Sequence, residues 1–95
     1  MAIDFGTSHI TVAVGADTGA PLSSIKAPIK YFTPADGPRT GLEFDPAETL
    51  NLVTATAQSA IGAADISPDE ITGIGVTSQR QGLVLLNLEG LPIYA

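Results

Sequence analysis

The sequence of 95 residues contains no cysteine and no tryptophan, and it has few basic residues. Without cysteine, disulfide bonds and thiolate metal sites are excluded. Four basic residues stand against ten acidic ones, which gives a net charge of −6. Because nucleic-acid-binding domains carry a basic patch or stripe, we expect no nucleic-acid partner. Any phosphate group that binds must be held by backbone amides, hydroxyl groups and a divalent metal ion rather than by a cluster of lysines.

Long apolar runs are missing as well. The longest, Leu83-Val84-Leu85-Leu86, is far shorter than the ~20 residues of a transmembrane helix. The N-terminus also lacks the basic and apolar regions of a secretory signal. We therefore expect a cytoplasmic protein with no membrane partner. With 44% hydrophobic and 15% charged residues, the chain is more apolar than an average domain, so part of its surface is expected to meet something outside these residues.

The first third of the chain predicts three β-strands joined by tight turns. Alternating apolar residues place Ile10, Val12 and Val14 on one face of the second strand. Gly6-Thr7-Ser8 marks the first turn, and Asp17-Thr18-Gly19 is a hairpin signal in which glycine supplies the positive φ that such turns need. We expect an antiparallel meander of strands at residues 2–4, 10–16 and 21–27, the last continuing as an extended stretch to residue 32.

One helix is expected after a loop at residues 33–41 that is rich in proline and glycine. Asp45 can cap its N-terminus, Pro46 suits the first helical position, and Glu48 completes a capping box. The helix should end near Ala64. Apolar residues at three- and four-residue spacing form the side that should pack against the sheet: Leu50, Val53, Ala57, Ala60, Ile61 and Ala64.

The C-terminal third predicts a short capped turn, a strand and a hairpin. Ser67 and Glu70 repeat the capping pattern over a single turn. The strand at residues 72–78 follows a helix, so it should lie parallel in the sheet through a right-handed crossover. Strands at residues 82–86 and 91–95 should form a terminal hairpin. The expected fold is therefore α/β: an antiparallel meander, a helix, a parallel strand and a hairpin.

The segment Asp4-Phe5-Gly6-Thr7-Ser8 lies between the first two strands. A glycine turn followed by two hydroxyl residues presents backbone N–H groups and two side-chain donors to one point, which can cradle phosphate without net positive charge. Asp4 can hold a magnesium ion through water, since Mg²⁺ keeps much of its hydration shell. The same residues also suit an ordinary hairpin, and the motif alone does not separate the two interpretations.

Gln79, Arg80 and Gln81 follow the predicted parallel strand. A planar guanidinium beside two amides can bind vicinal hydroxyls through paired hydrogen bonds. These residues are therefore candidate ligands of a small-molecule sugar or polyol. The alternative is a surface Arg80 that pairs with Glu70 or Glu89.

Two stretches of the chain resemble known families. Residues 2–14 resemble the first phosphate motif of the actin/Hsp70/sugar-kinase superfamily. Residues 43–92 resemble the FGGY carbohydrate kinases through a proline-opened acidic helix, an Ile-Gly-Val-Thr-Ser-Gln strand, a Gly-Leu-Val-Leu-Leu strand and an Asn-Leu-Glu-Gly-Leu-Pro turn. The resemblance implies a ribonuclease H-like fold and an enzyme that uses ATP and Mg²⁺. It implies Asp4 near the metal ion, Gly6, Thr7 and Ser8 around the ATP phosphates, and Gln79, Arg80 and Gln81 at the substrate.

The sequence departs from the family pattern at two positions near the phosphate motif. Thr11 stands where many members carry lysine or arginine, so either phosphate binding is weaker or that charge comes from elsewhere. His9 stands where serine or threonine is common, and we expect it at the solvated surface. Gln79-Arg80 resembles the glycerol kinases, whereas Gln79 with Gly82 resembles the xylulose kinases. A polyol and a ketose therefore both remain candidate substrates.

The catalytic aspartate, the second phosphate motif and the adenosine pocket of the family lie downstream of the matched stretch. Residues 1–95 are therefore expected to be the incomplete N-terminal part of domain I of an FGGY kinase, inactive alone. The strand at residues 72–78 should then have an open neighbouring position, which the remainder of the kinase or a partner would cover. Two alternatives stay open: an actin- or Hsp70-like ATP-binding module for assembly, and a catalytically dead remnant that acts in binding.

Overall fold

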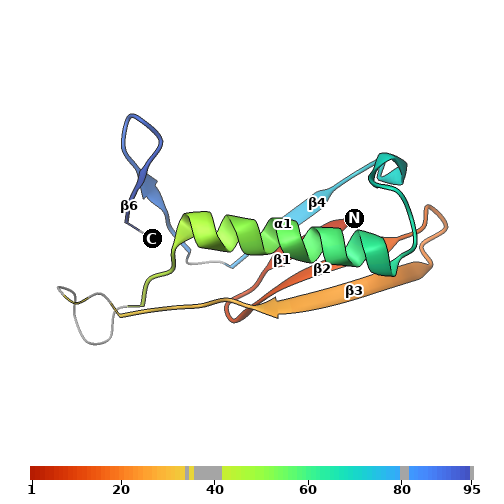
Figure 1. Cartoon of the computed structure of the whole chain (residues 1–95), viewed down its shortest axis with the longest axis horizontal. Coiled ribbons are helices and arrows are strands. Elements are labelled where there is room, and N and C mark those ends of the chain that lie inside the picture. Colours follow the sequence, from red (N-terminus) through yellow and green to blue (C-terminus); the bar gives the residue numbers. More distant parts are fainter. Residues whose placement is uncertain (34, 36–41, 80–81, 95) are drawn as a thin grey trace.

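The structure is a computed structural model that describes residues 1–33, 35, 42–79 and 82–94. Its elements follow the order β1, β2, β3, α1, a short 3₁₀ helix (η1), β4, β5 and β6. Strands β1 to β4 form one sheet in the order β3-β2-β1-β4, and β5 pairs with β6 in a separate two-stranded sheet. Figure 1 shows α1 lying along the larger sheet, with the hairpin of β5 and β6 beyond one end of the helix.

The predicted antiparallel meander is confirmed. It consists of β1 (Ala2–Phe5), β2 (His9–Gly15) and β3 (Pro21–Pro28), with β2 paired to both neighbours. Gly19 closes the second turn with a φ of +88°, which favours glycine because it has no Cβ. Beyond β3, Phe32 forms an isolated antiparallel bridge with Glu43, so both ends of the predicted loop are held together. Residues 34 and 36–41 of that loop lie outside the described residues.

The predicted helix is confirmed as α1 (Pro46–Ala63), with Ala64 as its C-terminal cap. The Asp45 carboxylate accepts a hydrogen bond of 3.1 Å from the backbone N–H of Glu48, which satisfies one of the free donors of the first turn. The carboxylate of Glu48 itself lies 3.8 Å from Lys30 Nζ. After α1, η1 (Pro68–Glu70) begins where Glu70 Oε2 accepts a hydrogen bond from the N–H of Ser67.

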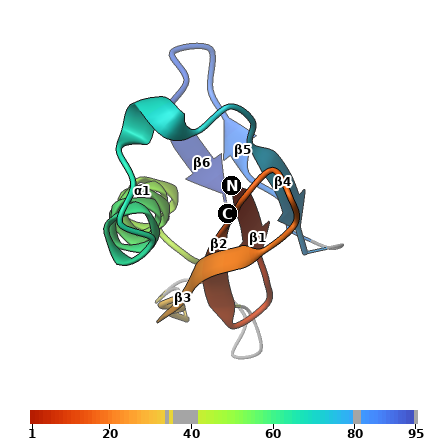
Figure 2. The same ribbon diagram turned by 90° about the vertical axis from the view of Figure 1, so that its right-hand side faces the viewer.

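The core lies between α1 and one face of β2 and β3, and Figure 2 shows the helix on that side of the sheet. Alternation along β2 buries the three residues predicted for this face. Small residues of α1 allow close packing, and Ser23 Oγ donates a hydrogen bond of 2.6 Å to the Ala60 carbonyl. The buried hydrophobic residues are Ile10, Val12, Val14, Ile29 and Ala60.

One residue of the predicted helix face was assigned wrongly. Leu50 is 65% exposed, whereas Thr49 and Thr56 are buried. Adjacent helical residues are about 100° apart around the axis, so a stripe that contains Thr49 turns Leu50 toward solvent. Thr56 tolerates burial because its hydroxyl donates a hydrogen bond of 2.7 Å to the Leu52 carbonyl. The other members of the predicted face do pack on the core: Val53, Ala57, Ala60, Ile61 and Ala64.

The predicted parallel strand is confirmed as β4 (Gly75–Ser78), although it is shorter than residues 72–78. The register sets Gly75 opposite Ala2, and the backbone of Met1 already contacts Gly73 and Gly75, so the pairing with β1 ends there. The terminal hairpin is also confirmed, again with shorter strands: β5 (Leu85–Leu86) and β6 (Pro92–Tyr94). Ala95 lies outside the described residues.

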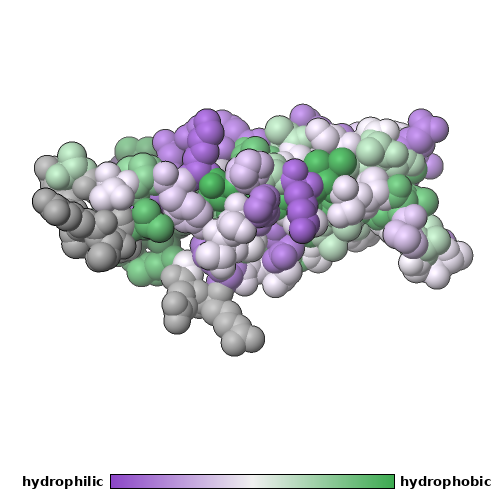
Figure 3. Space-filling model, turned by 90° about the horizontal axis from the view of Figure 1, so that it is seen from below, coloured by the Kyte–Doolittle hydropathy of each residue, from purple (hydrophilic) through white to green (hydrophobic). Residues whose placement is uncertain are grey.

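Many apolar side chains remain on the surface of the described residues. Val76 on β4 is 71% exposed, and Ile93 on β6 is 66% exposed. Figure 3 shows hydrophobic residues scattered among hydrophilic ones on the face seen from below. β4 is also an edge strand within the described sheet, which confirms its open neighbouring position. No helix among the described residues is long and apolar enough to span a bilayer.

Candidate functional site: a glycine turn beside a strand end

The turn between β1 and β2 is closed by backbone contact between Gly6 and His9. The N–H of Gly6 donates a hydrogen bond of 2.9 Å to the His9 carbonyl oxygen. A Cβ atom at Gly6 would lie 3.0 Å from that same oxygen, closer than side chains normally approach a backbone oxygen. Glycine is therefore favoured here, because a side chain would push against the backbone that closes the turn.

The carbonyl groups of Thr7 and Ser8 are both held from the β3 side. Tyr31 Oη donates a hydrogen bond of 2.6 Å to the Thr7 carbonyl, and the N–H of Ile29 donates one of 2.9 Å to the Ser8 carbonyl. In a trans peptide the N–H points opposite to the carbonyl, so the N–H of Ser8 points away from Tyr31. Within the described part of the chain, the N–H groups of Thr7 and Ser8 donate no backbone hydrogen bond, which leaves them open to a ligand.

An aromatic cluster supports this turn, and sequence reasoning missed it. The ring of Phe44 lies 5.8 Å from that of Phe5 and 6.2 Å from that of Tyr31, measured between centroids. Such tilted and edge-on arrangements are favourable for aromatic rings. The sequence offered one signal for this cluster, namely that aromatic residues are few. The chain has three phenylalanines and two tyrosines, and three of these five residues meet beneath this turn.

Asp4 lies in β1 directly opposite Thr11 of β2 and Thr77 of β4. The neighbours of Asp4 in the strand, Ile3 and Phe5, pack on the core, so Asp4 points to the sheet face away from α1 and is exposed. No group of three or more histidine, cysteine, aspartate or glutamate side chains among the described residues could hold a metal ion. A single exposed carboxylate fits Mg²⁺, which is commonly bound through one or two carboxylates, substrate phosphates and water.

Gln79 meets the end of β1 next to the turn of Gly6, Thr7 and Ser8. Its N–H donates a hydrogen bond of 2.8 Å to the Phe5 carbonyl, which extends the parallel pairing of β1 and β4 by one step. Ser78 and Gln79 line a pocket of about 160 Å³, together with Phe5, Phe44, Gly82, Leu83 and Val84. The structure therefore brings the turn and the first predicted substrate residue to one end of the sheet.

Two of the predicted substrate residues, Arg80 and Gln81, lie outside the described residues. The alternative pairing of Arg80 with Glu70 or Glu89 lies outside them for the same reason. The neighbouring Gly82 is described, and a Cβ atom there would approach the side chain of Gln79 to 3.0 Å. Gln79 is therefore the predicted substrate residue whose surroundings are defined.

His9 is exposed, as predicted, but it has a partner that the sequence did not indicate. Its Nδ1 atom lies 2.8 Å from Ser8 Oγ. The hydroxyl of Ser8 is thus oriented by an adjacent imidazole before any ligand binds. Thr7 shows no such side-chain partner within the described residues, so its hydroxyl is free to meet a ligand.

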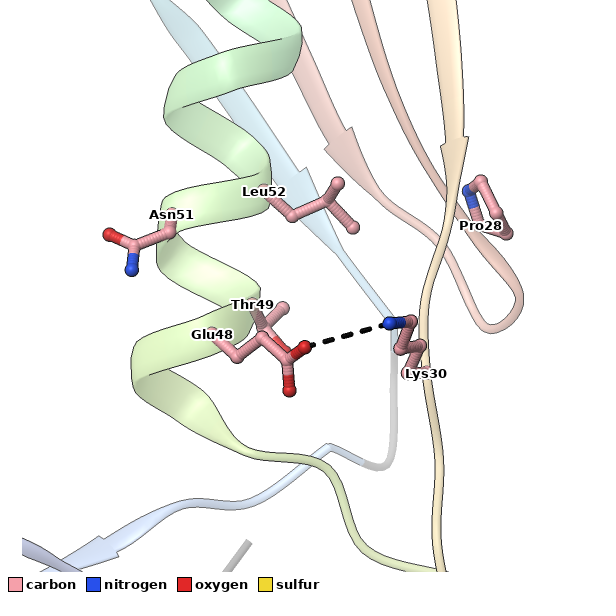
Figure 4. A pocket seen from close by; sticks show the side chains of 6 residues that line it. All are labelled: Pro28, Lys30, Glu48, Thr49, Asn51 and Leu52. Atoms are coloured by element: carbon pink, nitrogen blue, oxygen red, sulfur yellow. Dashed lines mark ion pairs between the residues drawn. The ribbon is translucent and has the colours of Figure 1, made fainter.

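A second pocket lies on the helix side of the molecule, between α1 and the chain that leaves β3 (Figure 4). It has a volume of about 290 Å³, and the ion pair of Lys30 and Glu48 crosses its rim. Most of the surface that its walls expose belongs to carbon atoms, although several of the lining residues are polar. It shares no lining residue with the pocket at Gln79. Its lining residues are Pro28, Lys30, Glu48, Thr49, Asn51 and Leu52.

Known kinases are similar to this chain along nearly its whole length. Glycerol kinase from Corynebacterium efficiens is 36% identical over 94 residues, which cover 98% of this chain and 18% of that protein. Glycerol kinase from Mycoplasma pneumoniae is 35% identical over 95 residues, covering 99% of this chain and 18% of that protein. Autoinducer-2 kinase from Escherichia coli K12 is 32% identical over 95 residues, covering all of this chain and 18% of that protein.

The chain therefore spans about a fifth of the length of the curated relatives that it matches. The match to a protein family has the same extent, because residues 1–95 align with the N-terminal domain of the FGGY family of carbohydrate kinases. The mixed α/β fold, with one sheet packed against one helix, is compatible with that match. The chain belongs to the FGGY family of carbohydrate kinases.

Proposed function

We propose that this chain is the N-terminal segment of an ATP-dependent carbohydrate kinase that transfers the γ-phosphate of ATP to a hydroxyl of a sugar or polyol. Within that enzyme, residues 1–95 would form the first part of domain I, on a ribonuclease H-like sheet. The antiparallel meander, the single helix and the parallel β4 agree with the beginning of such a sheet. A cytoplasmic location goes with this proposal.

The observation that carries the proposal is the hydrogen bond between Gln79 and Phe5. It sets a turn suited to phosphate beside a side chain suited to hydroxyl groups, although the two are more than 70 residues apart in the sequence. Phosphoryl transfer depends mainly on holding donor and acceptor in line. Two binding elements at one sheet end are what a phosphate donor and a hydroxyl acceptor require.

In this proposal Gly6, Thr7 and Ser8 bind the terminal phosphates of ATP. Gly6 allows the close turn, while Thr7 and Ser8 offer open N–H groups and their hydroxyls. Asp4 would hold Mg²⁺ through water, and the metal ion would offset the negative charge of the phosphates.

The amide of Gln79 binds a substrate hydroxyl, together with Arg80 and Gln81. Gln79 contributes both a donor and an acceptor, which suits a hydroxyl group. The relatives named glycerol kinase favour a polyol, and the relative named autoinducer-2 kinase widens the choice to other hydroxylated substrates.

The proposal includes the expectation that residues 1–95 alone transfer no phosphate. The open edge of β4 and the exposed Val76 need a covering element, which the remainder of the kinase chain would supply. The purified 95-residue chain, given ATP, Mg²⁺ and a panel of polyols and ketoses, should yield no phosphorylated product. Phosphorylation of glycerol or xylulose by this chain above a no-protein control would contradict that expectation.

A further inference from the structure

Among the described residues, few basic side chains are available to the turn of Gly6, Thr7 and Ser8. The turn itself has no basic residue, and Asp4 adds a negative charge beside it. The N-terminal ammonium group is engaged with the Gly73 carbonyl at 2.9 Å. Within the described part of the chain, the basic side chains are Lys26 and Lys30. Among these described residues, a nucleotide with several phosphate charges therefore finds few sources of electrostatic attraction.

The strand register brings Lys26 into line with Asp4. Lys26 of β3 is directly opposite Thr11 of β2, and Thr11 is directly opposite Asp4 of β1. Residues directly opposite each other in antiparallel strands project from the same face of a sheet. All three side chains therefore stand on the face away from α1, in one row that crosses the strands.

The distances in this row bring the ammonium group of Lys26 close to Asp4, which lies two residues, or roughly 7 Å along the chain, from Gly6. Neighbouring strands are about 4.8 Å apart, so the Cα atoms of Lys26 and Asp4 are separated by roughly 10 Å. The side chain of a lysine extends about 6 Å from its Cα atom, from five bonds of about 1.5 Å each. Thr11 lies between them and is short, so it leaves the space above the row open.

Lys26 and Lys30 differ in whether they form an ion pair with another described residue. Lys30 Nζ is 3.8 Å from Glu48 Oε1 on α1, and Figure 4 shows this pair beside the pocket on the helix side. Lys26 is exposed and makes no ion pair with any other described residue. The two lysines thus have equal charge on nearby parts of the chain, but different surroundings.

We infer that Lys26 reaches across Thr11 and supplies positive charge to the terminal phosphate held at the turn of Gly6, Thr7 and Ser8. Lys26 then strengthens the binding of nucleotides that carry more phosphate charge, although it lies on β3 and outside the turn. The inference rests on the proposed function of the turn as an ATP phosphate site. It adds a binding residue that the turn motif does not contain.

The test compares Lys26→Gln with Lys30→Gln in the longest polypeptide that carries residues 1–95, with equilibrium binding of ATP and ADP as the readout. Both variants remove one positive charge, so a general change in net charge affects them equally. Lys26→Gln should weaken ATP binding roughly five- to tenfold, since the lost interaction is that of unit charges several ångströms apart near a protein surface. Lys30→Gln should stay within about twofold of the unaltered protein, because Lys30 is engaged with Glu48.

Two further readouts separate an electrostatic role from a structural one. The loss caused by Lys26→Gln should be larger for ATP than for ADP, and it should shrink as ionic strength rises from about 0.05 M to 0.5 M. Thr11→Lys in the Lys26→Gln background should restore ATP binding, because it returns the charge one strand nearer to Asp4. Melting temperatures of all variants should agree, because Lys26, Lys30 and Thr11 lie outside the buried core.

The outcomes distinguish the two proposals. If the unaltered polypeptide binds no ATP, the proposed function of the turn fails, and the role of Lys26 fails with it. If it binds ATP while Lys26→Gln and Lys30→Gln bind equally well, the proposed function stands and the role of Lys26 is overturned. An equal loss for ATP and ADP that does not respond to salt also overturns it.

Discussion

The backbone N–H of Gln79 donates a hydrogen bond of 2.8 Å to the carbonyl oxygen of Phe5. This bond continues the parallel ladder of β1 and β4 past the last strand residue, Ser78. Its effect is to fix the end of β4 against the start of the turn of Gly6, Thr7 and Ser8. The proposed substrate residue Gln79 and the proposed phosphate-binding turn are thereby positioned by the same backbone contact.

Replacing Gly6 by alanine should damage the turn. The new Cβ atom would lie 3.0 Å from the His9 carbonyl oxygen, and that oxygen belongs to the backbone that closes the turn. We expect a loss of about 1–3 kcal/mol in the free energy of unfolding, because the added methyl group crowds a backbone oxygen and forces the turn to shift. Urea unfolding followed by circular dichroism measures it.

The matched control is Gly62→Ala in α1, where a Cβ atom would meet nothing within 4 Å. Alanine favours a helix over glycine, so this variant should be neutral or more stable by up to about 1 kcal/mol. Equal effects of the two alanine substitutions would contradict the claim that the close approach of the His9 carbonyl favours glycine at position 6.

Replacing Tyr31 by phenylalanine should loosen the turn without disturbing the aromatic cluster. The ring against Phe44 is kept, while the hydrogen bond of 2.6 Å to the Thr7 carbonyl is lost. We expect a loss of about 0.5–1.5 kcal/mol in the free energy of unfolding. Hydrogen exchange of the Gly6 amide, whose bond to the His9 carbonyl closes the turn, should become faster when measured by NMR. Unchanged exchange at Gly6 would show that Tyr31 does not hold the turn.

The helix face can be checked by comparing two truncations of large apolar side chains. Ile10 is fully buried in β2, so Ile10→Ala should cost about 2–5 kcal/mol in the free energy of unfolding. Leu50 is 65% exposed, so Leu50→Ala should cost less than about 0.5 kcal/mol. Chemical unfolding of both variants provides the measurement. A large loss in the free energy of unfolding for Leu50→Ala would show that Leu50 belongs to the packed face of α1.

The edge of β4 should make the 95-residue chain self-associate. Val76 is 71% exposed on a strand whose outer side is unpaired within the described sheet. Exposed apolar edge strands promote pairing between chains, and a lysine on such a strand opposes it. Val76→Lys should therefore lower the average mass in sedimentation velocity at equal concentration. Thr54→Lys, on the exposed side of α1, is the control and should leave the mass unchanged.

Local patterns predicted the order and pairing of the main elements. The alternation at Ile10, Val12 and Val14 predicted the buried face of β2, because strand residues alternate between the two faces of a sheet. Asp45 and Pro46 predicted the start of α1, because capping depends on adjacent residues alone. The helix before β4 predicted its parallel pairing.

Features that depend on distant partners could not be predicted in the same way. Leu50 was misplaced because a hydrophobic count treats threonine as polar, whereas Thr56 is buried with its hydroxyl bonded to the preceding turn. The contact between Tyr31 and Thr7 joins residues 24 positions apart, and no local pattern encodes it. The meeting of Gln79 with Phe5 required the strand register, although both motifs were visible in the sequence.

The most direct test of the proposed function is a phosphoryl-transfer assay on the longest polypeptide that carries residues 1–95, with a panel of polyols and ketoses. The unaltered protein should phosphorylate at least one of them with ATP. Gln79→Ala should raise the KM for that substrate about tenfold or more while changing the KM for ATP less than about twofold, since a site that hydrogen-bonds a hydroxyl loses the binding of that group. No phosphorylation of any substrate, or an equal rise of both KM values, would contradict the account.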